Sequence, residues 1–307
     1  MLVGVVDSDQ RVLHESVGPS LGLDEEGLIE KLELELKKAR DARPGVVAAG
    51  LGLPCTIDRK RGVAITAVNL PITDVPVRDL MTESLGLPVY IDNDANVAAI
   101  SEHRFGAAVG AQNVVMLTIG TGIGGGLILG GKPYRGSTGA GAELGHMVVD
   151  LDGPPCQGNC PNHGCIEAVA SGTALGREGR AAAQDAPDSA LGRVLAEGGE
   201  VDGRAVTGAA LAGDETAREV LGLVGRRLGA AFSSYANIFD PDLIVVGGGV
   251  MAAGDLLLDP AREEVRARAL PPMNRTPVKA AKLGPEAGMV GAAAMAMIEL
   301  EEKEAAL

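Results

Sequence analysis

One histidine and three cysteines that could bind a metal lie close together near the middle of the sequence. They are His146, Cys156, Cys160 and Cys165, and the cysteines follow a Cys-x3-Cys-x4-Cys pattern among glycine, proline and asparagine residues. One nitrogen and three sulfur donors form a tetrahedral set typical of structural zinc. Four protein ligands leave no open position for water, so we expect zinc to fold this loop rather than to react. His163 is the competing nitrogen ligand.

The alternatives to zinc at these cysteines are disulfide bonds and free thiols. The sequence opens Met-Leu-Val-Gly-Val-Val-Asp, which reaches an acidic residue too early for a secretory signal peptide, and no apolar run is long enough to span a membrane. We therefore expect a cytoplasmic protein, in which reduced thiols favour a metal over disulfides. Cys55 stands apart from the other cysteines and is expected to be a buried thiol.

An acidic residue that could act as a general base lies at a predicted strand-to-helix junction. The segment Asn93-Asp94-Ala-Asn96 follows an apolar run and begins a predicted helix that reaches Phe105. An aspartate there is commonly a helix cap. The same position suits a general base, because the helix N-terminus orients the carboxylate and the strand end presents it to a cleft. Both interpretations of Asp94 remain open at this stage.

Other polar residues on predicted loops could surround a ligand. They are Asn69 in Asn-Leu-Pro, Glu143 near His146, and Glu167 near Cys165. Each on its own is typical of a solvated surface. Together, beside a zinc loop, they could offer paired hydrogen-bond donors and acceptors to a polyhydroxylated ligand.

A glycine-rich run at residues 120–126 follows a strand-like segment. Its spacing loosely matches a dinucleotide fingerprint, but the strand-like residues 127–129 follow where a helix is required. A P-loop is excluded because Pro133 replaces the magnesium-binding Ser or Thr. What remains is a hairpin in which Gly120, Thr121 and Gly122 can approach phosphate oxygens, or a tight hairpin with no ligand.

A second glycine loop, Gly247-Gly248-Gly249, follows the buried-type strand 243–246. Two such loops in one chain favour a nucleotide ligand over an empty hairpin. The sequence therefore predicts a nucleotide and a polar ligand in one molecule.

The elements that must position these residues alternate between strands and helices, which predicts an α/β fold. A hairpin of residues 2–6 and 11–17 opens the chain, and a helix capped by Asp24 ends before Pro44. The further predicted strands are 46–52, 63–68, 89–92, 114–119, 127–129 and 243–246, and the further predicted helical stretches are 173–236 and 287 to the C-terminus.

The overall composition favours two lobes and excludes nucleic acid as a partner. The 307 residues suffice for two medium domains, and with 46% apolar but only 2% aromatic residues their cores must consist of Ala, Val and Leu. The formal charge of −14 includes no basic cluster to neutralise phosphates. We expect one lobe at 1–108 and a second at 109–307, with a zinc loop at 146–167.

The sequence resembles the ROK family of bacterial sugar kinases, with the glucokinases as the nearest group. The most specific stretch is Gly139-Ala-Gly-Ala-Glu-Leu-Gly-His146, followed by Cys156, Cys160 and Gly164-Cys-Ile-Glu167, which is similar to the family's zinc signature. The first cysteine gap is longer here than in the common Cys-x-Cys-Gly form, which alters the loop but not the number of ligands. Leu53-Pro54-Cys55 also departs from the usual Pro-Gly.

The resemblance implies an actin-like fold of two lobes that closes over ATP, magnesium and a hexose. It implies ATP-dependent phosphorylation, with glucose ahead of N-acetylmannosamine, N-acetylglucosamine and fructose, by a homodimer or homotetramer. A regulatory ROK protein that binds sugar without catalysis is the alternative. Asp94 would be the base, and Gly120-Thr121-Gly122 and Gly247-Gly248-Gly249 the phosphate and adenosine loops. The implied sugar ligands are Asn69, Asn93, Glu143, His146 and Glu167, with His146 also on zinc.

The family's Asp-x-Gly-Gly-Thr hairpin, which supplies its first strand and first phosphate loop, would precede Leu2-Val-Gly-Val-Val-Asp7 and is not in this sequence. We expect a start codon upstream of Met1. Without a central strand, the sheet would have two unpaired edges and a cavity between them.

Overall fold

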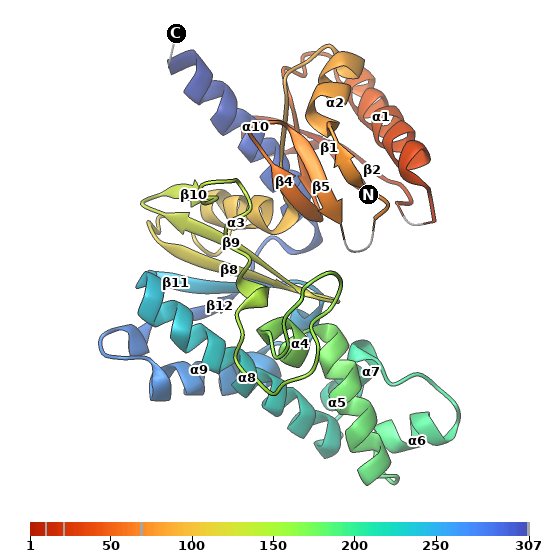
Figure 1. Ribbon diagram of the computed structural model, residues 1–307, viewed down its shortest axis with the longest axis vertical. Coiled ribbons are helices and arrows are strands. Elements are labelled where there is room, and N and C mark those ends of the chain that lie inside the picture. Colours follow the sequence, from red (N-terminus) through yellow and green to blue (C-terminus); the bar gives the residue numbers. More distant parts are fainter. Residues whose placement is uncertain (10, 21, 68–69, 306–307) are drawn as a thin grey trace.

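The computed structural model describes residues 1–9, 11–20, 22–67 and 70–305, and it has the expected α/β architecture (Figure 1). Its strands are β1 (Leu2–Val6), β2 (Val12–Val17), β3 (Ala49–Leu53), β4 (Cys55–Asp58), β5 (Val63–Ala67), β6 (Thr73–Val75), β7 (Val89–Asn93), β8 (Val114–Ile119), β9 (Ile123–Leu129), β10 (Lys132–Tyr134), β11 (Leu243–Gly247) and β12 (Val278–Ala280). Its α-helices are α1 (Glu25–Ala42), α2 (Val77–Leu85), α3 (Asp94–Phe105), α4 (Ile166–Ala170), α5 (Gly172–Asp185), α6 (Ala190–Ala196), α7 (Gly203–Leu211), α8 (Glu215–Phe239), α9 (Asp255–Arg268) and α10 (Ala287–Ala305).

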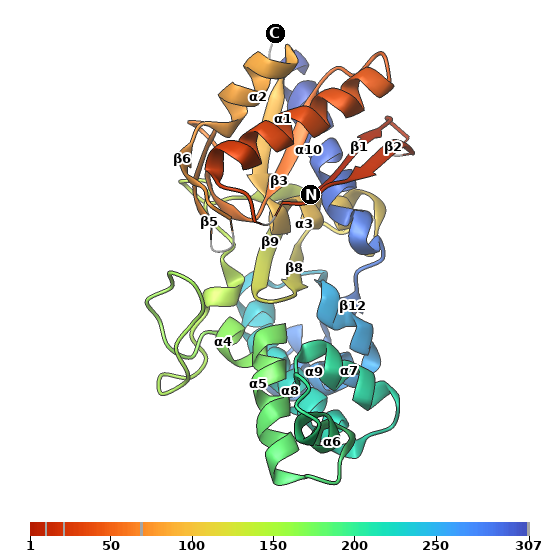
Figure 2. The same ribbon diagram turned by 90° about the vertical axis from the view of Figure 1, so that its right-hand side faces the viewer.

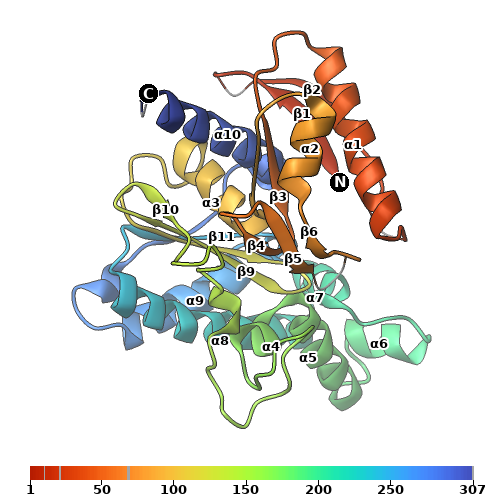
Figure 3. The ribbon, with the colours of Figure 1, turned by 45° about the horizontal axis from the view of Figure 1, so that its top comes forward.

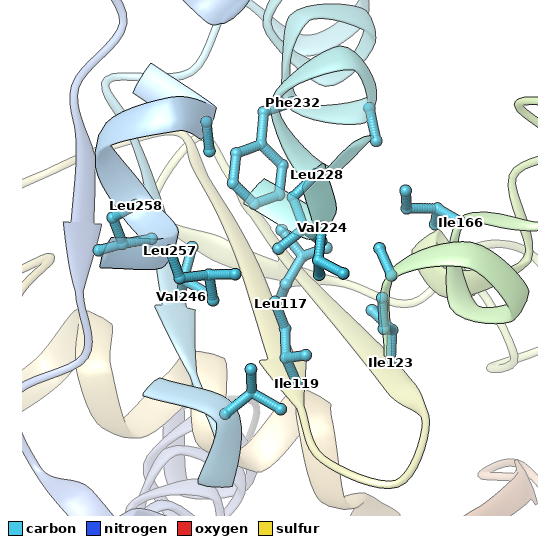
Figure 4. Packing of buried hydrophobic residues seen from close by; sticks show 14 of the residues in the cluster. Leu117, Ile119, Ile123, Ile166, Val224, Leu228, Phe232, Val246, Leu257 and Leu258 are labelled. Atoms are coloured by element: carbon cyan, nitrogen blue, oxygen red, sulfur yellow. The ribbon is translucent and has the colours of Figure 1, made fainter. Parts of the chain in front are cut away.

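A five-stranded sheet of order β10-β9-β8-β11-β12 forms the centre of the C-terminal half. β8 and β11 run parallel, while β9 returns antiparallel beside β8. Because successive side chains in a strand point to opposite faces, Val115, Leu117 and Ile119 all enter one core. That core lies against α8 and α9, where Leu228 and Phe232 are fully buried (Figure 4).

The opposite face of this sheet is covered by α3 and α10. Val114 and Met116 point to this side and pack with Ala292 and Met295 of α10. In Figure 3 the C-terminal helix α10 lies beside α3 and β3, although both elements are far from it in the sequence. α10 belongs to the expected second lobe in sequence but packs on elements of the expected first lobe, 1–108, and so joins the two parts of the chain. The boundary itself stays a prediction.

The N-terminal region, defined here as β1–β7 with α1 and α2, has no continuous sheet among its described residues. The pairs β1–β2 and β3–β7 form separate two-stranded sheets, and β4, β5 and β6 form a third (Figure 2). Between β1 and β3 lies a cavity of about 1320 Å³, lined also by α1 and α10. Leu28, Leu51 and Met289 are among its lining residues. The two open strand edges and the cavity are those that the sequence predicted.

Most predicted elements are confirmed, and the glycine run is one of the exceptions. The turn after β8 involves only Gly120–Gly122, because β9 begins at Ile123 and includes the remaining glycines. A Cβ atom at Gly126 would lie 2.7 Å from the Ala95 carbonyl oxygen. Glycine in the strand therefore lets the first turn of α3 pack directly on β9.

Some predicted boundaries differ from the structure by a few residues, and some short strands were not predicted at all. The strand expected at 46–52 begins at Ala49, after an irregular stretch that follows α1. The short strands β4, β6 and β10 were not predicted, because three or four residues carry little periodic pattern. Asp24 does cap α1, since its side chain accepts a hydrogen bond from the Gly27 amide at 2.9 Å. No helix in the described part of the chain is long and apolar enough to cross a membrane.

Candidate active site

Asp94 is the first residue of α3, directly after β7. Asn93 caps the helix, and its side-chain oxygen accepts a hydrogen bond from the Ala95 amide at 2.9 Å. The Asp94 carboxylate accepts from the same amide at 2.9 Å. Asn93 is the N-cap residue, whereas Asp94 is the first residue inside the helix, so capping does not by itself account for the Asp94 carboxylate. This geometry supports the interpretation of Asp94 as a reactive carboxylate.

The surroundings of Asp94 favour its protonated form more than water does. Its side chain is accessible to solvent. Nevertheless, desolvation by the neighbouring protein raises the pKa of the carboxyl above its ordinary value of 3.8, against the lowering effect of the helix amides. An accessible carboxylate with a raised pKa is a better proton acceptor than an ordinary surface aspartate.

The two glycine loops meet at the carboxyl ends of β8 and β11, two inner strands of the five-stranded sheet. Gly120–Gly122 follows the C-terminal end of β8, Gly247–Gly249 begins at the last residue of β11, and these two strands are parallel neighbours. Gly248 has a φ of +92°, and a Cβ there would lie 2.3 Å from the Ile119 carbonyl oxygen. Only glycine allows the loops to come this close. The carboxyl ends of neighbouring parallel strands are a common ligand-binding position in α/β folds.

The first glycine loop is held by the start of α5. The Gly172 amide donates to the Gly120 carbonyl at 2.7 Å, and the Thr173 hydroxyl donates to the Thr121 carbonyl at 2.9 Å. The Thr121 side chain is exposed, and a Cβ at Gly120 would meet no atom within 4 Å. The loop thus has a fixed backbone and open space beside it, as a phosphate-binding turn requires.

The four predicted zinc ligands converge in the structure. One ligand atom from each of His146, Cys156, Cys160 and Cys165 lies within 4.8 Å of the others. The Cys160 and Cys165 sulfurs are 3.9 Å apart, and the Cys156 sulfur is 3.4 Å from His146 Nδ1. Zinc–sulfur bonds of about 2.3 Å place two tetrahedral ligands roughly 3.8 Å apart, so the cluster fits zinc. His163, in contrast, is exposed and contacts the Gly153 carbonyl.

Without a cation this cluster favours neutral thiols. Burial raises the pKa of Cys156, and the adjacent thiols Cys160 and Cys165 raise it further. Zinc binding requires thiolates and so releases protons on binding. Three sulfurs that converge with this donor geometry, two partly buried and one buried, are more consistent with a metal site than with three free thiols.

Two carboxylates, Glu143 and Glu167, lie near both the zinc cluster and Asp94. Burial raises the pKa of Glu143, the charges of Asp94 and Glu167 add to the rise, and His146 opposes it. Glu143 also lies 4.0 Å from His146 Nε2. Glu167 accepts a hydrogen bond from the Ile123 amide at 2.7 Å, which places it against the first glycine loop. Segments far apart in sequence thus bring carboxylates close together, and such acceptors suit sugar hydroxyls.

The structure gives less support for a sugar contact at the two other predicted ligands, Asn69 and Asn93. Asn69 lies outside the described residues. Asn93 has a partner at each end of its side-chain amide, because besides capping α3 it donates to the Cys55 carbonyl at 3.3 Å. Its structural role at the helix start is therefore clear, and contact with a sugar stays a prediction.

Gln157 and Tyr235 support the site but were not singled out from the sequence. The Gln157 side chain donates to the Thr121 carbonyl at 3.3 Å and to Ser171 Oγ at 3.1 Å, which links the zinc loop to the glycine loop. The buried Tyr235 hydroxyl donates to the Leu144 carbonyl at 2.6 Å and fixes the turn before His146. Neither residue has a sequence signal, because each acts on a segment distant in the chain.

Comparison with known proteins gives this architecture a family. The sequence profile of the ROK family matches residues 2–299. The chain belongs to the ROK family. It is 36% identical over 301 residues to a glucokinase from Streptomyces coelicolor, which covers 95% of this chain and 93% of that protein.

Solved structures of ROK proteins share the fold of this chain. A ROK family glucokinase from Streptomyces griseus, solved in complex with glucose and AMPPNP, matches with a TM-score of 0.83 and 36% identity over 96% of this chain and 95% of its own. A ROK family transcriptional regulator, a homologue of the E. coli MLC protein, matches with a TM-score of 0.86 at 26% identity, over 96% of this chain but 74% of the regulator. The ROK fold therefore occurs in both sugar kinases and regulators.

Proposed function

We propose that this ROK family protein is an ATP-dependent glucokinase that converts glucose to glucose 6-phosphate. The observation that carries the proposal is the convergence of Asp94, the carboxylates Glu143 and Glu167, and two glycine loops around one region of the structure. The 36% identity to glucokinases along nearly the whole chain supports it. The regulator is less similar in sequence, at 26% identity.

In this mechanism Asp94 accepts the proton of the sugar hydroxyl as that oxygen attacks the γ-phosphorus of ATP, and the bond from this phosphorus to the bridging oxygen breaks to release ADP. Phosphoryl transfer needs mainly positioning and charge stabilisation. The amides of Gly120–Gly122 would face the phosphate oxygens, and Gly247–Gly249 would contact the adenosine. Glu143, His146 and Glu167 would hold the sugar hydroxyls, with Asn69 and Asn93 as further predicted contacts. Such alignment turns a bimolecular step into an effectively unimolecular one.

The two metals have separate parts in the proposal. Magnesium, bound together with ATP, would supply positive charge beside the phosphates during transfer. Zinc would be structural, bound by His146, Cys156, Cys160 and Cys165, where it fixes the loop that leads to Glu167. A homodimer or homotetramer stays a prediction.

A phosphorylation assay with a hexose panel tests the proposal. We expect turnover with ATP and glucose to exceed that with N-acetylmannosamine, N-acetylglucosamine or fructose, and polyphosphate should be compared as the donor. Asp94→Asn should lower kcat by about 10² to 10⁴-fold, which is the usual contribution of general base catalysis, and should keep glucose binding. If glucose raises the melting temperature but no ATP is consumed by the wild type, the protein is a sugar-binding regulator instead.

A further inference from the structure

Asp92, two residues before Asp94, is a charged group that the proposed reaction does not use. Its side chain has no exposed surface. A buried carboxylate is costly unless it is paired and hydrogen-bonded on both oxygens. The contacts of Asp92 therefore indicate what the residue is for.

One oxygen of Asp92 organises the start of α3. Oδ1 accepts hydrogen bonds from the Asn93 amide and from the side chain of Asn96, each at 2.9 Å. The Asn96 side chain is itself buried. These bonds fix the strand-to-helix junction on which Asp94 lies.

The other oxygen of Asp92 binds a different segment of the chain. Oδ2 accepts a hydrogen bond from Arg135 Nε at 2.5 Å, and Arg59 Nε lies 3.7 Å away. Arg135 follows β10, and only 16% of its side chain is exposed. The Asp92–Arg135 pair thus joins β7 to the segment after β10.

Arg135 lies at the start of the loop that leads to Glu143 and His146. Its carbonyl accepts a hydrogen bond from the Gly141 amide at 2.9 Å, which folds residues 135–141 back on themselves. Two residues later the chain reaches Glu143. The position of Arg135 therefore fixes where the loop begins its approach to the site.

We propose that the Asp92–Arg135 ion pair is a positioning device that sets the separation between Asp94 and the loop bearing Glu143 and His146. The inference rests on the proposed function, because it assigns this loop to the sugar. A displacement of about 1 Å in such a group can change a rate or affinity by up to about 100-fold. Neither Asp92 nor Arg135 touches the substrate in this role.

Arg135→Gln is the main test, because Arg135 lies at the edge of the buried region and Arg59 remains near Asp92 after its removal. We expect the glucose KM to rise by about tenfold or more, while the ATP KM stays within about twofold and the zinc content is unchanged. Arg135→Lys should recover part of the loss, since it restores the positive charge without the Nε geometry.

Asp92→Asn probes the same pair from the other side. The Asn side chain can still accept from Asn93 and Asn96 but presents an amide to Arg135 instead of a carboxylate. We expect the double variant Asp92→Asn/Arg135→Gln to raise the glucose KM no more than the worse single variant, because both remove one interaction. If Asp92→Asn does not fold, Arg135→Gln and Arg135→Lys still decide the matter.

Arg262→Gln is the matched control. Arg262 is also partly buried, pairs with Asp255 and Asp259, and donates through Nε to the Val278 carbonyl at 3.0 Å, but it lies on α9. A folded Arg135→Gln with an unchanged glucose KM would overturn the proposal. The proposal would also be overturned if Arg135→Gln raised the glucose KM and the ATP KM equally and lowered the melting temperature as much as Arg262→Gln does. A wild type that neither phosphorylates nor binds hexose would overturn the proposed function as well, whereas binding without turnover leaves the pair testable by glucose affinity.

Discussion

The two sheet systems of this protein differ in continuity. In the C-terminal half, five strands form one sheet with a packed core on each face, and Val115, Leu117 and Ile244 in it are fully buried. In the N-terminal region, three small sheets surround a cavity of about 1320 Å³, and β1 and β3 each have an open edge among the described residues. The glycine loops therefore sit on a continuous sheet, whereas Asp94 follows a strand from a two-stranded one.

This difference indicates which contacts hold the candidate site residues in place in each part of the molecule. Neighbouring strands hold the glycine loops through main-chain hydrogen bonds. Asp94 depends instead on α3, which packs on β9 of the five-stranded sheet and against α10. Asp94 is thus positioned more by the packing of α3 on β9 and α10 than by the two-stranded sheet that precedes it.

The largest expected effect is on stability, and it comes from one substitution made in both halves. Leu228→Ala in α8 removes a side chain with no exposed surface, while Leu28→Ala in α1 removes one that already lines the cavity. We expect Leu228→Ala to lower the free energy of unfolding by about 4 to 5 kcal/mol and Leu28→Ala by about 2 to 3 kcal/mol, because packing is already incomplete at the second site. Urea denaturation measures both. Equal losses would mean that the two regions are equally well packed in solution.

Gly248→Ala tests whether the continuous sheet imposes the close approach of its loops. Alanine at this φ of +92° is strained, and its Cβ would press on the Ile119 carbonyl. We expect a loss of about 1 to 3 kcal/mol in unfolding free energy, together with a higher ATP KM. Gly249→Ala is the stability control, because a Cβ there meets no atom within 4 Å. A melting temperature for Gly248→Ala equal to that of Gly249→Ala would show that the loops are farther apart in solution.

Zinc removal should separate the sugar-binding loop from the nucleotide side. We expect protein that has been chelated, dialysed and resupplied with magnesium to show a glucose KM raised about tenfold, with a smaller change in ATP KM, because the cluster shares His146 with the sugar loop. Added zinc should restore the value. Metal analysis of Cys160→Ser should show lost zinc, whereas Cys55→Ser, outside the cluster, should retain it. Full activity in zinc-free protein would show that zinc is not needed to position the sugar-binding loop.

Much of this arrangement could be predicted from the sequence, but the contacts between distant segments could not. The cysteine spacing identified the metal cluster, and the apolar runs before Gly120 and Gly247 identified two strands with loops at their ends. Nothing in the sequence placed Glu167 against Ile123 or Arg135 beside Asp92, because these contacts depend on how helices and sheets pack. The glycines of β9 were mistaken for loop residues because they too are required by tertiary contacts: α3 lies close to Gly124 and Gly126, and the Ala142 carbonyl lies close to Gly125.

The smallest expected effect is a pH dependence of stability that reports on the packing around Asp94. Because desolvation by the neighbouring protein raises the pKa of Asp94 above 3.8, native Asp94 holds its proton at pH values where the unfolded chain has lost it. Stability contributed by the protonated form is therefore full below the ordinary pKa and is lost as pH rises through the raised one. We expect the melting temperature of the wild type, relative to Asp94→Asn, to fall across this window, while kcat/KM rises with pH as the carboxylate forms. A difference that does not change with pH would mean that water reaches Asp94 freely, and that the open N-terminal region does not keep the carboxylate desolvated in solution.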